Sequence, residues 1–442
     1  MKDIFSTPLP VIPGTTQEFS EGTTPIRRTV LPSGVRVISQ YVSTSPSVAL
    51  SAWVPVGARD EQAGHEGSTH YLEHLLFKGT GKRSASDIAR AFDRVGGESN
   101  ATTTKEYTNY YAIILREDLP MACEVLLDMV TSPALAPDDF AVERGVIINE
   151  LQLAADDPID VATEAFAPKT FGAESALSRP TGGTISSVEA TSLDAVRDHH
   201  ARYYRPASLL ITAAGNVDHD ALVAMVEENL AAGGWDLVQA HPFEAPRRVA
   251  PSLAVDSERE IIEKPVELAY VLTGYPAMSA ADPRRPILST LAMILGGGMS
   301  SRLFQEVREK RGLAYSTYAY TSAYTDAGYL ALYAGCPMKH VDEVERCMVA
   351  QLEDLADAGP TPTELDDAFG QLRGSFALGL DDNRSRMSRL GGSEIVRHSY
   401  TTVADHLAGL QSVTRDDVID LARAIVEQPR ACVVVGPGRN SD

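Results

Sequence analysis

The residues His70, Glu73 and His74 form the motif H-x-x-E-H, the reverse of the H-E-x-x-H motif of zinc proteases. On a helix, positions three and four residues apart share one face, so both imidazoles can bind a single metal ion with the carboxylate beside them. Neutral imidazoles suit zinc, and a nearby carboxylate can take a proton from water bound to that zinc. The motif therefore predicts a hydrolytic zinc site. The alternative is an ordinary helix that happens to carry two histidines.

A short helix is expected to carry this motif. Ser68 or Thr69 can cap its start, three leucines between positions 72 and 76 give it an apolar side, and Gly79 can end it. Both histidines would then face the same way from one rigid element.

A catalytic zinc site also needs a third protein ligand, usually from elsewhere in the chain. Residues 137–151 predict a second helix, because Pro and Asp open the segment and apolar residues recur along it. Glu143 and Glu150 are seven positions apart, so they share a face of this helix about 10 Å apart along its axis. One of them can bind the metal while the other supports a ligand, and spacing alone does not choose between them.

The motif at 70–74, followed further along the chain by Glu150 in the segment 143–150, resembles the pitrilysin/insulinase family of inverzincin metallopeptidases. The segments 74–80 and 97–111 resemble the mitochondrial processing peptidase β subunit and its bacterial relatives. The resemblance extends over nearly the whole chain, from about residue 29 to residue 436.

This resemblance implies a function and a ligand set. His70, His74 and Glu150 would hold one Zn²⁺ per chain, Glu73 would be the general base, and Glu143 would support a ligand from behind. The reaction would be hydrolysis of unfolded peptides or oligopeptides inside a closed chamber. The family also includes non-catalytic structural and partner subunits, which is the alternative. A hydrolase that acts on another kind of bond is a further alternative that no residue favours.

The resemblance also implies an assembly. Larger relatives enclose their chamber with four similar units, and this chain resembles two of them. A homodimer, or a pairing with a related inactive chain, would supply the other two units.

Two further groups of residues are candidates for substrate binding. Asn100, Ala101 and Thr102 have β character and small side chains, and either an internal strand or an exposed edge strand fits them equally well. The resemblance places them beside the metal and favours the edge strand, although many relatives carry an aromatic residue where this chain has Thr102.

Arg308 and Tyr315 resemble an Arg–Tyr pair that insulysin-like enzymes bring from the partner half to the catalytic centre. Without that resemblance, they would be taken for a surface arginine and a core tyrosine.

Composition limits the classes of function. The chain has 442 residues, enough for two domains, and a formal net charge of −21. A nucleic-acid-binding protein needs a basic face, so this balance argues against one. The charge favours basic peptide substrates, and solubility explains it equally well.

Other patterns bear on the location of the protein. No run of 18 apolar residues is present, so no membrane span is expected, and the first ten residues lack the apolar core of a signal peptide. We therefore expect a cytoplasmic protein with no membrane partner. The four cysteines form no C-x-x-C pair, and buried free thiols are expected.

The chain contains one helix–strand pattern twice. Val196 and Val418 lie in equivalent helical segments, and Gly215 and Gly436 end equivalent strands. The separation along the chain is the same for both pairs to within one position, and such a shared lag indicates duplication, with coincidence as the alternative. The segment 286–295, at the place of the first motif, contains no His or Glu, so the second copy is expected to bind no metal.

These patterns predict an α+β fold of two homologous domains, each a mainly antiparallel sheet packed with helices, forming half of a clamshell. The expected divisions are a loose N-terminal arm at 1–25, a catalytic zinc-binding domain at 26–235, a Pro-rich linker at 236–260, and an inactive domain at 261–442 that contributes to substrate binding.

Overall fold

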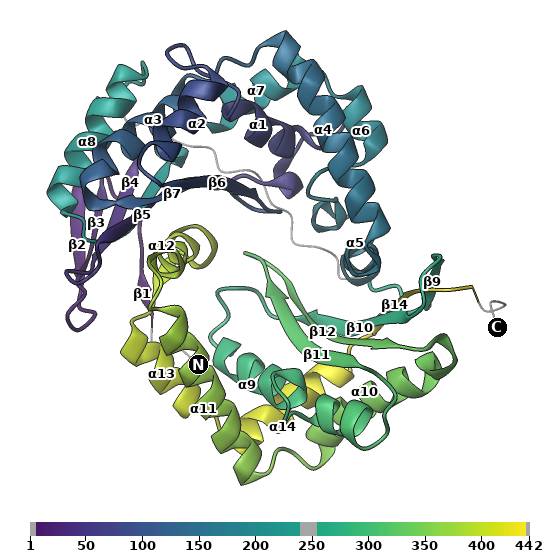
Figure 1. Ribbon diagram of the computed structural model, residues 1–442. Helices are drawn as coiled ribbons and strands as arrows, with labels where there is room; N and C mark the ends of the chain where they lie inside the picture. The colour runs from purple at the N-terminus through teal and green to yellow at the C-terminus, as the bar shows by residue number, and fades with distance from the viewer. Residues whose placement is uncertain (1–5, 239–253, 439–442) are drawn as a thin grey trace.

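Two β-sheets with helices on their outer faces are arranged opposite each other in the computed structural model, which describes residues 6–238 and 254–438 (Figure 1). The strands of the first half are β1 (Thr7–Pro8), β2 (Thr15–Phe19), β3 (Ile26–Val30), β4 (Arg36–Tyr41), β5 (Ser47–Val54), β6 (Glu98–Thr103), β7 (Thr108–Leu115) and β8 (Leu210–Gly215). Its helices are α1 (Ser68–Leu76), α2 (Ala85–Asp93), α3 (Leu119–Thr131), α4 (Pro137–Asp156), α5 (Pro158–Phe171), α6 (Ile185–Ala190), α7 (Leu193–Tyr203) and α8 (His219–Ala232).

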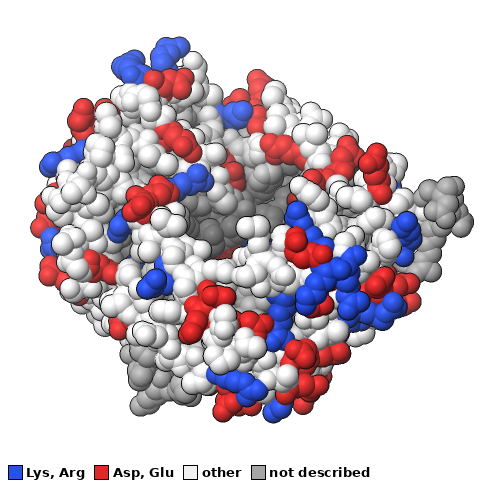
Figure 2. Space-filling model, turned by 60° about the horizontal axis from the view of Figure 1, so that its bottom comes forward, with Lys and Arg blue, Asp and Glu red and all other residues white. Residues whose placement is uncertain are grey.

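The second half repeats this organisation. Its strands are β9 (Glu260–Glu263), β10 (Ala269–Ala277), β11 (Ser316–Ala323), β12 (Gly328–Cys336), β13 (Ser399–Tyr400) and β14 (Ala431–Gly436). Its helices are α9 (Arg285–Gly296), α10 (Val341–Asp357), α11 (Pro362–Gly379), α12 (Asn383–Gly392), α13 (Val403–Gln411) and α14 (Arg415–Val426). Figure 2 shows a hollow between the halves, with acidic and basic side chains interspersed on the face around it.

The strand order confirms two copies of one fold. The first sheet has the order β2-β3-β4-β8-β5-β7-β6, and the second has the order β9-β14-β10-β12-β11. The last five strands of the first sheet therefore match the second sheet one for one. Each sheet has a single parallel pair, β4 with β8 and β9 with β14, and its other pairs are antiparallel. The predicted α+β class with mainly antiparallel sheets is confirmed.

The two halves exchange equivalent helices. Helix α5 of the first half packs on β10 and β14 of the second sheet, and α12 of the second half packs on β4, β5 and β8 of the first sheet. Figure 1 shows both helices between the two sheets. Phe166 and Phe171 of α5 join a buried cluster with Leu272 and Tyr329, and each such side chain contributes roughly 1.5–3 kcal/mol by leaving water.

Because of this exchange, the inner face of each sheet is covered by a helix from the other half. Strands β8, β12 and β14 are buried at every position, which requires cover on both faces. One face is covered by helices of the same half and the other by the exchanged helix. The halves therefore stabilise each other and fold as one unit.

The N-terminal segment differs from the loose arm predicted at 1–25. Among its described residues, β1 pairs with β13 of the second half and β2 pairs with β3, at the edge of the first sheet. Leu9 between them is only 5% exposed and packs in an apolar cluster with Trp53 and Leu390. One buried leucine and two strand pairings hold in place a segment whose Pro and Thr content predicts a loose arm. Residues 239–253 of the predicted linker lie outside the described residues.

All four cysteines are buried free thiols, as predicted. In the two described stretches, no helix has the length and apolar character needed to cross a membrane.

A buried ion pair joins the two halves. Arg28 of β3 and Glu394, in the π-helical turn η7 (Ser393–Arg397) after α12, have side chains that are 0% and 1% exposed. Arg28 Nη2 lies 2.7 Å from Glu394 Oε1, and Arg36 Nη1 lies 3.5 Å from the same oxygen. One carboxylate thus compensates two buried guanidinium groups.

We expect Glu394→Gln to lower the free energy of unfolding by about 3–5 kcal/mol, because it leaves two buried arginine charges without their counter-charge. Urea unfolding followed by circular dichroism measures the change. Asp194→Asn is the control, since Asp194 forms an exposed pair with Arg197 that contributes about 1 kcal/mol or less. Equal unfolding midpoints for Glu394→Gln and the control would contradict this account of the interface.

Candidate metal centre

The helix that carries the motif begins differently from its prediction. Neither Ser68 nor Thr69 caps it; the N-cap residue is Gly67, whose φ of +94° favours glycine. The buried carboxylate of Glu61 accepts hydrogen bonds from the backbone N–H groups of Gly67 at 2.8 Å and Thr69 at 2.7 Å. A carboxylate from outside the helix therefore replaces the side-chain cap, at the end where the helix dipole favours negative charge. Helix α1 ends at Leu76, and Gly79 follows it.

The three predicted metal ligands lie together. Nε2 of His70 is 3.8 Å from Oε2 of Glu150, and Nε2 of His74 is 3.4 Å from the same oxygen. One donor atom from each of the three residues can be chosen so that all lie within 4.8 Å of one another. The histidine side chains are 20% and 15% exposed, and that of Glu150 is 48% exposed. The group is therefore open to solvent on the side of α4.

Glu143 contacts the other nitrogen of the His74 ring. Its Oε2 lies 2.9 Å from His74 Nδ1, and its Oε1 lies 2.7 Å from Lys78 Nζ. When Nδ1 donates to Glu143, the lone pair of Nε2 points towards Glu150. Burial alone would raise the pKa of Glu143, but the bonds from Lys78 and His74 lower it overall. The two carboxylates that spacing could not distinguish thus occupy different positions around one imidazole.

His70 is held by packing rather than by a hydrogen bond. Its Nδ1 is buried and has no hydrogen-bond partner among the described residues. Gly182 packs against the ring, since a Cβ at that position would lie 3.4 Å from Nδ1. Burial, with a smaller contribution from His74, lowers the pKa of His70 to about 4, so the imidazole is neutral at neutral pH.

These donors fit a zinc ion. Two Nε2 atoms and one carboxylate oxygen match a three-ligand catalytic site, and at least one ring is held neutral. A carboxylate behind a ligating histidine is the usual support for such a site.

Glu73 lies between the motif helix and the edge of the sheet. Thr103, the last residue of β6, donates a hydrogen bond from Oγ1 to Glu73 Oε2. Burial raises the pKa of Glu73, and the bond from Thr103 opposes that rise. A raised pKa brings a carboxylate closer to the range in which it can both accept and return a proton.

The candidate substrate-binding residues Asn100, Ala101 and Thr102 lie on β6, which is the end strand of the first sheet. Among described strands, β6 pairs only with β7, so its other edge is available to an added strand. The predicted position at a sheet edge beside the motif helix is therefore observed. Side chains alternate along a strand, and Thr103 faces Glu73 while Thr102 lines a pocket on the other face.

The second half holds the turn that follows β6. Arg59 Nη1 donates to Glu106 Oε1 at 2.6 Å and to Asp326 Oδ1 at 2.8 Å. Thr325 donates its backbone N–H to Glu106 Oε2 at 2.9 Å. The hairpin between β11 and β12 thus fixes one end of the edge strand.

Arg308 and Tyr315 contact each other. Arg308 Nη1 donates to the carbonyl oxygen of Tyr315 at 2.8 Å, and the guanidinium lies 4.8 Å from the ring centres of Tyr315 and Phe304. Tyr315 is 77% exposed, so it is not the core tyrosine of the alternative interpretation. Among the described residues, neither makes a hydrogen bond or ring contact with the three candidate ligands.

Tyr315 lies at the far end of β11 from the first half. It precedes β11, and the hairpin that reaches Arg59 follows that strand. Eight residues of strand span about 26 Å. The structure therefore does not bring this pair to the motif helix of its own chain.

The sequence interpretation missed three residues that shape the site: Glu61, Lys78 and Thr103. Lys78 is four positions after His74, and this helical spacing could have indicated a partner for a carboxylate behind that histidine. Glu61 and Thr103 carry no local signal, because their partners lie on other elements.

Comparisons with known proteins identify the family of this chain. A family model described as insulinase (peptidase family M16) matches residues 36–184, and one described as the peptidase M16 inactive domain matches residues 190–372. The chain belongs to the pitrilysin/insulinase family, M16. The predicted similarity to the mitochondrial processing peptidase β subunit remains a prediction within this family.

Several bacterial M16 relatives are similar over most of their length. An uncharacterized zinc protease of Streptomyces coelicolor is 44% identical over 412 residues, which cover 93% of this chain and 90% of that protein. One of Mycobacterium tuberculosis is 41% identical, with 93% of each chain covered. One of Bacillus subtilis is 34% identical, with 94% of this chain and 99% of that protein covered.

Solved structures support the M16 fold. A protease from Helicobacter pylori superposes with a TM-score of 0.85 at 22% identity, covering 93% of this chain and 99% of that one. A peptidase M16 inactive domain from Pseudomonas fluorescens gives a TM-score of 0.84 at 19% identity, covering 96% and 98%.

Proposed function

We propose that this protein is a zinc-dependent endopeptidase that hydrolyses unfolded peptides or oligopeptides. The observation that carries the proposal is the convergence of His70, His74 and Glu150, with Glu73 beside them at the free edge of a sheet. The relatives described as zinc proteases support the same class of reaction.

The chain's own residues have distinct parts in the proposed reaction. His70, His74 and Glu150 would hold the ion, which when bound supplies the Lewis acidity that activates water and polarises a peptide carbonyl. Glu73 accepts the proton of the attacking water and returns it to the leaving amine. Thr103 orients the Glu73 carboxylate, and Glu143 orients the His74 ring.

The free edge of β6 supports a preference for unfolded substrates. An extended peptide can pair with Asn100, Ala101 and Thr102 through its backbone, which gives affinity with little dependence on sequence. A folded protein has most of its strands already paired, so it offers few extended segments to this edge. A peptide paired there would lie along the motif helix.

A second chain would complete the proposed site. Tyr315 would donate a hydrogen bond to the developing oxyanion and Arg308 would hold a substrate carbonyl, as their resemblance to the family pair implies. The exposure of Tyr315 and its distance from the motif helix of its own chain favour delivery to a partner's site in a homodimer, or in a pairing with a related inactive chain. A closed chamber of four units and a cytoplasmic location remain predictions.

A non-catalytic subunit is the alternative function. The second half matches a family model described as an inactive domain, which agrees with the absence of His and Glu from α9. The complete set of donors in the first half favours a catalyst, because a structural subunit has no need for three converging ligands with a half-buried carboxylate beside them.

We expect Glu73→Gln to retain zinc and to slow peptide cleavage by about 10²–10⁴-fold, because the variant keeps the ligands and loses the proton acceptor. Zinc content by atomic emission and cleavage of an unstructured fluorogenic peptide measure the two effects. Glu117→Gln, at an exposed position, is the control with the same change of charge. Equal cleavage by wild type and Glu73→Gln would remove Glu73 as the base, and a wild type that binds no zinc would favour the non-catalytic alternative.

We expect Glu143→Gln to weaken zinc binding by about 10–100-fold, because His74 loses its charged hydrogen-bond acceptor. Competition with a chromogenic chelator measures the dissociation constant. Glu150→Gln should weaken binding further, since it removes a ligand. An unchanged affinity in Glu150→Gln would show that the ligand set is wrong, and an unchanged affinity in Glu143→Gln alone would remove only its supporting role.

We expect Tyr315→Phe to slow cleavage by roughly 10²-fold, the usual effect of losing one oxyanion donor. Co-expression of Tyr315→Phe and Glu73→Gln chains with different tags allows the mixed dimer to be purified. If Tyr315 acts in the partner's site, one of two sites in that dimer is intact, and the mixed dimer should recover about half of the wild-type rate. An inactive mixed dimer would place Tyr315 in the site of its own chain, and wild-type cleavage by the Tyr315→Phe homodimer would place it outside the reaction.

A further inference from the structure

A pocket of about 330 Å³ lies on the inner face of the first sheet, where the two halves meet. Its lining comes from both halves: Trp53, Thr102, Tyr107, Asn109, Tyr111, Arg285, Ala323, Arg384, Met387, Ser388, Gly392, Val396 and Arg397. Three of these side chains are arginines, and one residue, Thr102, belongs to the edge strand β6. A smaller pocket of about 190 Å³ also has Arg285 and Arg397 in its wall.

Two of the arginines have no acidic partner among the described residues. Arg285 donates to the carbonyl oxygen of Ala280 at 3.3 Å, and Arg397 donates to Ser393 Oγ at 2.6 Å. Arg384, the third, lies 3.8 Å from Glu98, and its guanidinium is over the ring of Tyr111.

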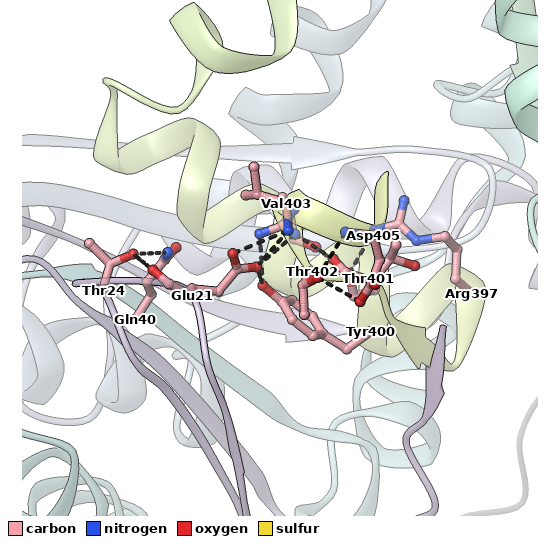
Figure 3. Close-up of polar contacts among 11 residues, drawn as sticks. Glu21, Thr24, Gln40, Arg397, Tyr400, Thr401, Thr402, Val403 and Asp405 are labelled. Atoms are coloured by element: carbon pink, nitrogen blue, oxygen red, sulfur yellow. Dashed lines mark hydrogen bonds and ion pairs between the residues drawn. The ribbon is translucent and has the colours of Figure 1, made fainter. Parts of the chain in front are cut away.

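Three carboxylates of the same region have other partners. Figure 3 shows Glu21 bonded to Tyr400 and to the backbone N–H of Val403, with Arg397 beside this network, and Glu21 also pairs with Arg389 at 3.0 Å. Asp282 and Asp405 line the smaller pocket. Asp282 pairs with Arg284, and Asp405 accepts a hydrogen bond from Thr402 at 2.6 Å.

The surroundings make these arginine charges costly. Burial, together with the neighbouring charges of Arg285 and Arg389, lowers the pKa of Arg397 to about 10. Burial also lowers the pKa of Arg285. A partly buried charge without a counter-charge is unfavourable unless a ligand supplies one, and guanidinium groups are suited to planar carboxylates.

The pocket is placed to contact a peptide bound at β6. Thr103 faces Glu73 on one side of the sheet edge, and Thr102 faces the pocket on the other. A peptide paired with this edge alternates its side chains in the same way. A residue within about two positions of the cleaved bond would therefore point into the pocket.

We propose that the pocket lined by Arg285, Arg384 and Arg397 binds a carboxylate of the peptide substrate. This inference rests on the proposed function and adds a specificity to it: an acidic side chain, or the C-terminal carboxylate of the peptide, close to the cleaved bond. It is opposite to the preference for basic peptides that the net charge of −21 favours. The pocket is the local environment of a bound residue, whereas the net charge acts at long range and is screened by salt.

Binding of labelled peptides to the Glu73→Gln variant tests this proposal. Four unstructured peptides of one sequence carry either Glu or Gln beside the expected cleavage position, and either a free or an amidated C-terminus. We expect at least one kind of carboxylate to tighten binding by about tenfold or more in fluorescence anisotropy. The Glu/Gln pair and the acid/amide pair identify which carboxylate is bound.

Arg285→Met and Arg397→Met together should abolish this preference while the fully neutral peptide keeps its affinity. Arg284→Met is the matched control, because Arg284 precedes Arg285 and is exposed and paired with Asp282. The double variant should unfold at no lower urea concentration than wild type, since neither arginine loses an acidic partner. Equal affinity for all four peptides, or a preference that survives in the double variant, would overturn the proposal.

The two proposals can fail separately. Cleavage of the peptides by wild type without any preference for a carboxylate would overturn the pocket and leave the endopeptidase. Tight binding of the acidic peptides without cleavage by wild type would overturn the endopeptidase and leave the pocket. Absence of binding by all four peptides would overturn the pocket, and cleavage by wild type would still decide the function.

Discussion

The exchange of α5 and α12 between the two halves is the constraint on which the rest of the structure depends. In the described part of the chain, the inner face of each sheet packs against a helix of the other half, so separate halves would expose Phe166 or Leu390 to water. The exchange also brings the β11–β12 hairpin to the turn after β6 and brings Arg397 to the inner face of the first sheet. The end of the edge strand and the pocket therefore take their positions from this arrangement.

Within that frame, the metal centre depends on how α1 meets α4. His74 lies between two carboxylates of one helix: Glu143 faces Nδ1 and Glu150 faces Nε2. The separation of two helical turns allows one helix to supply both the support and the ligand. Glu143 is buried and also bonded to Lys78, whereas Glu150 is half exposed. Burial therefore matches the supporting role of Glu143, and solvent access matches the role of Glu150 as a ligand at a site that water can reach.

Local patterns in the sequence predicted the parts of the site that local geometry controls. The spacing of His70, Glu73 and His74 places them on one helical face, and the β character of Asn100, Ala101 and Thr102 indicated a strand there. The lag shared by the two helix–strand patterns indicated that the chain contains two copies of one unit. The cap by Glu61, the ordered N-terminal strands and the exchange of helices depend on contacts between distant elements, which no local pattern encodes. The arginine pocket was missed for the same reason, since Arg285 and Arg397 are far apart in the chain and a count of charges gives the opposite sign.

This difference between total charge and local charge bears on how an M16 chain could select peptides. In the proposed peptidase, backbone pairing at β6 would depend little on sequence, so selectivity would have to come from what the alternate side chains of the peptide contact. On one side they meet Glu73 and the candidate ligands, and on the other they meet a pocket with aromatic walls and guanidinium groups. A pleated strand keeps these two environments apart without any loop to separate them, because successive residues point in opposite directions. The candidate ligands can therefore stay fixed on one face, while substitutions on the other face would change which peptides the proposed peptidase prefers.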